Sequence, residues 1–458
     1  MRSKTFFRPA ALAWAVAPLL LFAYSRFGPP ARSTGAPGDQ LCTQASCHVG
    51  TPNSGPGGVE IAFPSGNTYV PGQKQSWIVT ITDPDAKVFG FQATARLASN
   101  PEFAQAGSFH APGPDTLVIC EDESEKPAGG ACPDMFPVEF IQHSDAKPEN
   151  TFRVEWTPPA EGNETVEVYI AANAANASGS PTGDRIYTAQ YALEPVTFTG
   201  APLIRQAQPV LQAFDNSERL SPGTYVQIFG QNLAATTRQW AAADFTPGLQ
   251  PGGVGPKSLD GVEVLINGKP ATVSYVSPTQ VNAVVPEDEH QGPVSVQVRH
   301  PGGESNTVQV DMFAATPALQ EHPLWERDGK KYVVALFPPD PDSPGQLTFV
   351  GPADLVNGVA LRPARSGETI IFYALGCGPV APPVPPGEIP TGLSRIVADF
   401  RFTFDGVAAA EADGFLAPGF VGLYQFQVKV PNVGPGDHRI ELVLDGRPTA
   451  QELYITTE

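Results

Sequence analysis

The sequence predicts an all-β protein, with three β-sandwich domains in series after a signal peptide. Turn-forming residues are abundant, with 45 Gly and 50 Pro among 458 residues, and charged residues are scarce, at 16%. Helical bundles need more charge on their exposed faces, whereas many short strands need frequent turns. Apolar residues alternate in short runs and keep no helical period beyond the N-terminus. At roughly 100–200 residues per domain, the length suits about three domains.

The formal net charge of −19 restricts the classes of partner. Such an acidic surface repels phosphate backbones and anionic lipid headgroups. We therefore expect neither nucleic acid nor a membrane surface as a partner. The same charge favours solubility.

Residues 1–25 read as a secretory signal peptide. Basic residues open the segment, an apolar run over 10–24 follows, and Ala23 and Ser25 supply the small residues that a signal peptidase recognises. The alternative is an uncleaved membrane anchor. However, a run of about 15 residues is shorter than the roughly 20 that span a bilayer. The mature chain is expected to be exported without a membrane span, to the periplasm, the cell surface or the extracellular space.

Cys42, Cys47 and His48 form the strongest chemical signal in the sequence. Two cysteines followed directly by a histidine are typical of covalent haem attachment. The thiols add to the porphyrin vinyl groups, and the imidazole becomes the proximal ligand of the iron. The usual gap between the cysteines is two residues and here it is four, which a bulged loop accommodates but which makes the motif less specific. The alternative is a small disulfide loop with an incidental histidine.

Other candidate ligands are less specific. His110, His143 and Met135 are candidates for a distal haem ligand, although each is more often an ordinary loop or surface residue. The acidic runs 83–85 and 121–125 match no defined calcium loop and are expected to be solvated surface. Since hydrolase and nucleotide-binding motifs are absent from the sequence, we expect a protein that is not an enzyme.

Export also decides how the remaining cysteines are interpreted. Cys120 and Cys132 flank the polar loop 121–131, and a disulfide between them would persist in an oxidising compartment. We predict that bridge. Cys377 is left over and is expected to be a buried small apolar residue.

The predicted elements follow in order. Residues 26–58 are rich in Gly, Pro and Ser, have no periodicity, and form a linker or loose cap that carries the Cys/His motif. A first sandwich is predicted over 59–200. Its strand signals are the alternating runs 59–63, 75–82, 88–95, 151–156 and 166–173.

A second pattern occurs twice, which predicts related sandwiches over 205–316 and 317–458. Four pairs of landmarks are separated by similar offsets: 144 for Gly223 and Gly367, 138 for Gly268 and Gly406, 145 for Pro286 and Pro431, and 143 for Gly303 and Gly446. Such agreement indicates an internal repeat. Each copy contains an Asn-Gly or Asp-Gly pair, which is typical of a tight hairpin turn.

The stretch over about 35–198 resembles the reelin-type (reeler) domain, in its bacterial form known as choice-of-anchor V. The resemblance rests on GAPGDQ, FGFQATA, VEWTPP and YIAANAANASGSPTGDRIYT, and 173–176 and 183–187 are its most specific segments. Bacterial members often carry Cys-x-x-Cys-His near the start. That motif maps onto Cys42, Cys47 and His48, with two inserted residues here.

The first copy of the repeat resembles an immunoglobulin-like IPT/TIG domain in SPGTYVQIFGQNLA, INGKPATVSYVSPTQVNAVVP and HPGGESNTV. The span of about 205–458 is similar to a C-terminal domain family of exported acidobacterial proteins. These resemblances imply immunoglobulin-like sandwiches and export, and they imply no chemistry.

Two functions from different classes remain open. The favoured one is an exported, non-enzymatic interaction protein of the cell surface or periplasm, which binds an unknown protein or polysaccharide. The alternative is a c-type haem protein for electron transfer, which uses Cys42, Cys47 and His48 to hold the haem.

Overall fold

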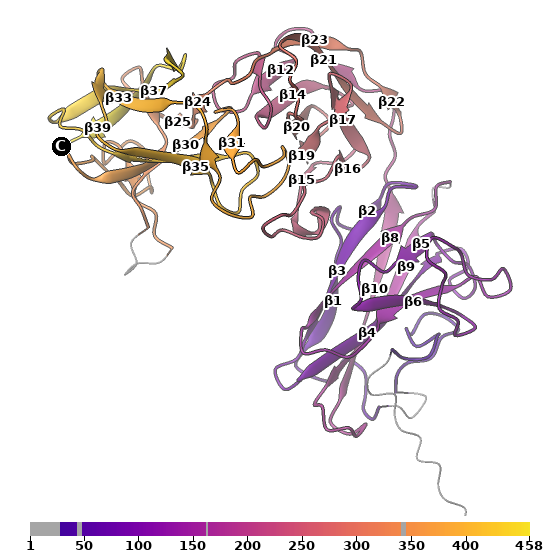
Figure 1. Ribbon diagram of the computed structural model, residues 1–458. Helices are drawn as coiled ribbons and strands as arrows, with labels where there is room; N and C mark the ends of the chain where they lie inside the picture. The colour runs from indigo at the N-terminus through magenta and orange to yellow at the C-terminus, as the bar shows by residue number, and fades with distance from the viewer. Residues whose placement is uncertain (1–27, 44–47, 162–163, 340–344) are drawn as a thin grey trace, which may run out of the picture.

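Strands dominate the computed structural model of the chain, which describes residues 28–43, 48–161, 164–339 and 345–458 (Figure 1). The predicted signal peptide and Cys47 lie outside the described residues. Within them, the single helical element is the 3₁₀ helix η1, Ala242–Asp244. The predicted all-β class is therefore confirmed. No helix in the described ranges is long and apolar enough to cross a membrane.

The described strands form six sheets, which enclose three apolar cores in chain order. We call strands β1–β10 the first unit, β11–β23 the second unit and β24–β39 the third unit. Figure 1 shows the three units in series, from indigo to yellow. Their order agrees with the predicted one, while the predicted domain boundaries stay a prediction.

The first unit packs a four-stranded sheet against a six-stranded sheet. In sheet order the smaller one contains β1 (Gly58–Ala62), β3 (Gln75–Thr82), β8 (Thr151–Thr157) and β5 (Ser108–His110). The larger one contains β2 (Thr68–Tyr69), β10 (Arg185–Pro195), β9 (Val166–Ala175), β4 (Val88–Leu97), β7 (Glu139–His143) and β6 (Thr116–Cys120).

Alternation along the strands explains the first core. In β3, Trp77, Val79 and Ile81 are fully buried, while the residues between them are partly exposed. Successive side chains of a strand point to opposite faces, so this period-two pattern buries one face only. Trp77 packs against Trp156 of β8, with ring centroids 5.0 Å apart.

The second unit also has two sheets. One contains β11 (Leu203–Ile204), β14 (Tyr225–Gln231), β20 (Gln280–Val284), β19 (Thr272–Val276) and β15 (Arg238–Gln239), with β12 (Val210–Gln212) paired to β14. The other contains β13 (Arg219–Leu220), β23 (Val308–Met312), β21 (Gly292–His300), β17 (Val262–Ile266) and β16 (Ser258–Leu259), with the short partners β18 (Lys269–Pro270) and β22 (Gly303–Glu304).

The third unit follows the same plan with extra edge strands. One sheet contains β29 (Leu361–Arg362), β28 (Phe349–Val350), β27 (Ala335–Leu336), β30 (Thr369–Leu375), β36 (Tyr424–Lys429), β35 (Ala412–Leu416), β32 (Arg395–Ile396) and β31 (Val380–Ala381), with β24 (Ala318–Leu319) paired to β30. The other contains β25 (Glu321–Arg327), β26 (Lys330–Val333), β39 (Leu453–Thr457), β37 (Gly436–Leu444), β33 (Phe400–Phe404) and β34 (Val407–Ala408), with β38 (Arg447–Pro448) paired to β37.

The strand orders of the second and third units correspond. The path β14-β20-β19 matches β30-β36-β35, and β23-β21-β17 matches β39-β37-β33. The hairpin turns correspond as well. Asn267-Gly268 and Asp405-Gly406 both have positive φ, at 51° and 74° and at 47° and 82°. Asn or Asp before Gly tolerates this left-handed conformation, and two such residues suit a tight hairpin. This correspondence is what the sequence repeat predicts.

Backbone hydrogen bonds and a small apolar cluster join the second and third units. Gly252 N–H donates to the carbonyl of Ile389 at 2.9 Å, and Ile389 N–H donates to Gly253 at 2.9 Å. Phe245, Val284, Ile389 and Val421 form the apolar cluster beside this contact. Because both polar pairing and apolar burial support it, the contact restricts movement between these units.

The cysteines of the folded units behave as predicted. Cys120 and Cys132 form a disulfide, with Cα atoms 5.5 Å apart. Cys377 is fully buried in the third core, and burial raises the pKa of its thiol. Both predictions are confirmed.

Candidate functional site

The segment before the Cys/His motif is fixed to the first unit by a buried ion pair. Asp39 Oδ2 lies 3.1 Å from Arg96 Nη2 of β4, and both side chains are fully buried. Asp39 also accepts hydrogen bonds from Arg32 at 3.0 Å and from the Thr34 hydroxyl at 2.7 Å. Buried charges persist where they are paired and hydrogen-bonded. Residues 28–43 are therefore an integral part of the first unit.

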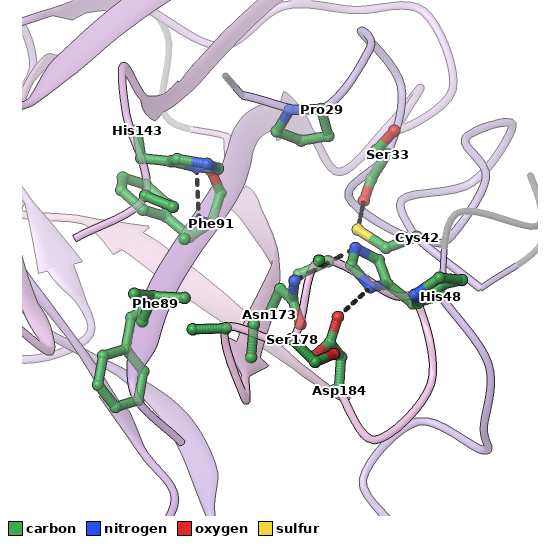
Figure 2. Close-up of a pocket in the computed structure, with 18 of the residues that line it drawn as sticks. Pro29, Ser33, Cys42, His48, Phe89, Phe91, His143, Asn173, Ser178 and Asp184 are labelled. Atoms are coloured by element: carbon green, nitrogen blue, oxygen red, sulfur yellow. Dashed lines mark hydrogen bonds and ion pairs between the residues drawn. The ribbon is translucent and has the colours of Figure 1, made fainter. Parts of the chain in front are cut away.

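A pocket lies between this segment, strands β4 and β9, and the loop before β10 (Figure 2). It encloses about 120 Å³. Val88, Ala171 and Ala175, which share the sheet face of Asn173, supply apolar wall, whereas the rings of the neighbouring phenylalanines of β4 pack into the first core. Its chemically active side chains come from Cys42, His48, His143, Asn173 and Asp184. Ligand sites commonly combine apolar walls with a few convergent polar groups in this way.

His48 is held at both ring nitrogens. Its Nδ1 lies 3.0 Å from Asp184 Oδ2, and its Nε2 lies 3.2 Å from the amide nitrogen of Asn173. A carboxylate only accepts, so Nδ1 carries the hydrogen and donates to Asp184. The Asn173 N–H then donates to Nε2. The imidazole is thus fixed in orientation at the wall of the pocket.

Cys42 lies beside His48 in the pocket lining, as Figure 2 shows. Its Sγ lies 3.7 Å from the carbonyl oxygen of Ser33. Cys47, the second cysteine of the motif, lies outside the described residues. The structure thus brings two of the three predicted haem-binding residues, Cys42 and His48, to one pocket, and the choice between haem attachment and a 42–47 disulfide stays open.

Of the three candidates for a distal ligand, His143 lines the same pocket. Its Nδ1 lies 2.9 Å from the Phe91 backbone nitrogen and 3.0 Å from the Phe91 carbonyl oxygen. The ring lies against Gly90, where an added Cβ would come within 2.5 Å of the His143 ring. Burial lowers the pKa of His143, and a hydrogen bond from Nδ1 to the Phe91 carbonyl opposes this only in part.

The other two distal candidates lie elsewhere. His110 is in β5, with Nε2 3.2 Å from the Thr157 hydroxyl. Met135 is 81% exposed to solvent. Neither residue lines the pocket.

The donor chemistry of the pocket fits a haem iron. A metal-binding histidine typically donates its second N–H to a carboxylate, as His48 does to Asp184. Asn173 Oδ1 is buried and has no hydrogen-bond partner among the described residues, so the polar groups here are incompletely satisfied. The enclosed 120 Å³ is below the roughly 300 Å³ at which pockets for drug-sized ligands begin. The hydrogen bond of His48 to a carboxylate thus suits an iron ligand, whereas the cavity as shaped here is smaller than a ligand of porphyrin size requires.

Sequence reasoning missed Asn173 and Asp184 as site residues. They follow His48 by 125 and 136 residues, and only the fold brings them together. Both belong to the segments that carry the reeler resemblance most specifically, which is the one signal that could have identified them. The expectation of a solvated surface was wrong for Asp83. Its carboxylate is 1% exposed, lies 2.7 Å from Arg185 and accepts from Tyr187 at 2.6 Å.

Comparisons with known proteins concern mainly the second unit. No curated protein matches the chain. Among solved structures, the chain is similar to surface layer protein SbsC, domains 4–9, at 11% identity over 88% of this chain and 66% of that one. The TM-score is 0.15, so this similarity carries no argument about fold or function. The reeler and acidobacterial resemblances stay predictions. Residues 209–311 match the family model of the IPT/TIG domain, so the chain contains an immunoglobulin-like domain of that kind.

Proposed function

We propose that this chain is an exported, non-enzymatic interaction protein of the cell surface or periplasm, and that it binds its ligand at the pocket beside His48. The observation that carries the proposal is the preformed pocket itself. Apolar walls from Val88, Ala171 and Ala175 stand beside an imidazole that is fixed at both nitrogens. Such preorganisation reduces the ordering cost of binding.

The second and third units act as the scaffold in this proposal. Residues 209–311 match an IPT/TIG domain, and the backbone contacts between Gly252, Gly253 and Ile389 support a stiff spacer. A stiff spacer holds the first unit away from the surface to which the chain is attached or bound. The ligand is an unidentified protein or polysaccharide of the cell envelope.

Co-sedimentation of the mature full-length chain with a cell-envelope fraction tests this proposal. Ser178 is exposed at the pocket lining, so Ser178→Trp blocks the pocket without disturbing the core. Ser99 is exposed beyond the far end of β4, so Ser99→Trp is the matched control. We expect the wild type and the control to sediment, and Ser178→Trp to remain in solution. Equal sedimentation of all three proteins would place binding elsewhere.

A second candidate function is electron transfer by a covalently bound haem c. The specific observation that favours it is the contact of His48 Nδ1 with Asp184, which turns Nε2 toward the pocket lining. Each thiol of Cys42 and Cys47 would add across one vinyl double bond. Sulfur bonds to one vinyl carbon and the hydrogen goes to the other, so no oxidant is consumed.

Expression in a host that attaches haem separates the two candidates. A haem protein gains the mass of one haem, resists extraction of the haem, and shows a sharp Soret band. Cys42→Ser should weaken covalent retention, and His48→Ala should remove the low-spin spectrum. A protein with a 42–47 disulfide and no added mass would exclude haem and leave the first candidate.

A further inference from the structure

We infer that Asp184 is a positioning residue that prepares His48 to bind iron, because it holds the imidazole in the tautomer whose Nε2 carries the electron pair. The inference rests on the haem candidate described above. Its geometric basis is the 3.0 Å contact between His48 Nδ1 and Asp184 Oδ2, in which both side chains are largely buried.

Asp184 is itself held in place. Its second oxygen, Oδ1, accepts a hydrogen bond from the backbone N–H of Asn176 at 3.1 Å. Its side chain is only 8% exposed. With one oxygen fixed by the backbone, the carboxylate cannot rotate away, and the other oxygen stays directed at His48.

The guanidinium of Arg185, the cation next to Asp184 in the sequence, pairs with other carboxylates. Arg185 follows Asp184 directly, but its guanidinium pairs with Asp83 at 2.7 Å and with Asp85 at 2.9 Å. Adjacent residues of an extended chain point in opposite directions. The acidic run 83–85 therefore holds Arg185, which leaves Asp184 to interact with His48.

The far side of the imidazole contacts the side-chain amide of Asn173. Nε2 is contacted by the Asn173 amide nitrogen at 3.2 Å, while Asn173 Oδ1 is buried without a hydrogen-bond partner among the described residues. Buried amides are normally satisfied at both ends. An iron bound at Nε2 would require the Asn173 amide nitrogen to move away from the ring.

The chemistry of a proximal histidine explains why the carboxylate matters. An N–H donated to a carboxylate fixes the ring, sets the tautomer and makes the other nitrogen more basic. Since a porphyrin supplies four ligands to its iron, one oriented imidazole is sufficient to anchor the metal on one face. A more basic imidazole stabilises ferric over ferrous iron and so lowers the reduction potential.

The first arm of the test needs no haem. Nitrogen NMR of the ¹⁵N-histidine-labelled, mature full-length chain reports the tautomer of His48, assigned by comparison with His48→Gln. We expect the Nδ1–H form in the wild type and in Asp85→Asn, the control, whose carboxylate is 73% exposed and does not contact His48. In Asp184→Asn, the amide N–H competes for Nδ1 and shifts the hydrogen to Nε2, as in catalytic triads. An Nε2–H form in the wild type overturns the inference, even if Asp184→Asn does not fold.

The second arm uses the same three proteins, matured in a haem-attaching host. Equal haem mass in all three, with a higher reduction potential in Asp184→Asn alone, supports the inference. If all three carry haem with the same potential and the same spin state, haem binding stands and the role of Asp184 is wrong. If the wild type gains no haem mass, the haem candidate fails, and the inference fails with it.

Discussion

Arg96 and Asp39 form an ion pair, 3.1 Å apart, in which neither side chain is exposed to solvent. Arg96 belongs to the central strand β4, whereas Asp39 belongs to the irregular segment just before the Cys/His motif. The pair is therefore a buried polar link between the framework of the first unit and the segment that brings Cys42 to the pocket.

Replacing Asp39 is expected to loosen this link. Asp39→Asn leaves the Arg96 charge buried without its partner, which costs on the order of 3–5 kcal/mol. The free energy of unfolding of the first unit, measured by denaturant titration, should fall by this amount. Asp115→Asn is the control, since Asp115 is 60% exposed and its pair with Lys147 is worth about 0–1 kcal/mol. Equal effects of the two substitutions would contradict the structural role of the buried pair.

The second prediction concerns the close packing of Gly90 against the His143 ring in the pocket. A Cβ on this residue would come within 2.5 Å of the His143 ring, so Gly90→Ala forces the imidazole to move. The expected cost is about 1–3 kcal/mol, as for other overpacked cores. A Cβ added to Gly58 of β1 would meet no atom within 4 Å. Gly58→Ala should therefore be neutral or slightly stabilising. Thermal unfolding of both variants decides this, and a Gly90→Ala protein as stable as the wild type would refute the close packing.

The disulfide should stabilise the loop that follows β6. Cys120 and Cys132 are separated by 12 residues, and closure of a loop of this size is worth about 3 kcal/mol by chain entropy. The double variant with both cysteines changed to Ser should lose roughly that much unfolding free energy. Mass spectrometry of an unreduced digest should show the two peptides linked. Recovery of both residues as thiols from exported protein would disprove the bridge.

The buried carboxyl of Asp83 should make the free energy of unfolding depend on pH in the acidic range. Burial alone would raise its pKa, but hydrogen bonds from Tyr187, from the backbone N–H of Asp85 and from Arg185 outweigh burial and lower the pKa. A carboxyl with a lowered folded-state pKa binds fewer protons folded than unfolded. Its stabilisation is thus present above the unfolded pKa of about 3.9 and is lost as the pH falls below it.

Titration of unfolding free energy between pH 6 and pH 3 tests this effect. The wild type should lose more stability below pH 4 than Asp83→Asn does, whereas Asp85→Asn, with a 73% exposed carboxylate, should follow the wild type. The prediction would be contradicted if the unfolding free energies of the wild type and of Asp83→Asn fell in parallel as the pH is lowered.

The sequence predicts the fold better than it predicts the site. Period-two burial, as in Trp77, Val79 and Ile81, is a local property of the chain, so the all-β class can be derived from it. The Asn267-Gly268 and Asp405-Gly406 turns are local too, and their positive φ values follow from residue type. The disulfide of Cys120 and Cys132 needed only a short loop and an oxidising compartment.

The pocket depends on contacts that no local pattern contains. His48 meets Asp184 across 136 residues, and Asp39 meets Arg96 across 57. Acidic residues are usually solvated, so Asp39 and Asp83 gave no sign of their burial until the sheet brought arginines beside them. Likewise, three residues could have served as a distal ligand, and only the placement of β7 next to β4 brought His143 to the pocket.

Hydrogen–deuterium exchange of the mature full-length chain, with and without a cell-envelope extract, tests most directly whether the pocket beside His48 is the binding site. The account predicts that peptides over 28–43 and 171–184 gain protection in the wild type, and that Ser178→Trp abolishes this gain. Protection confined to the second and third units, or no protection in an extract that retains the protein, would contradict it.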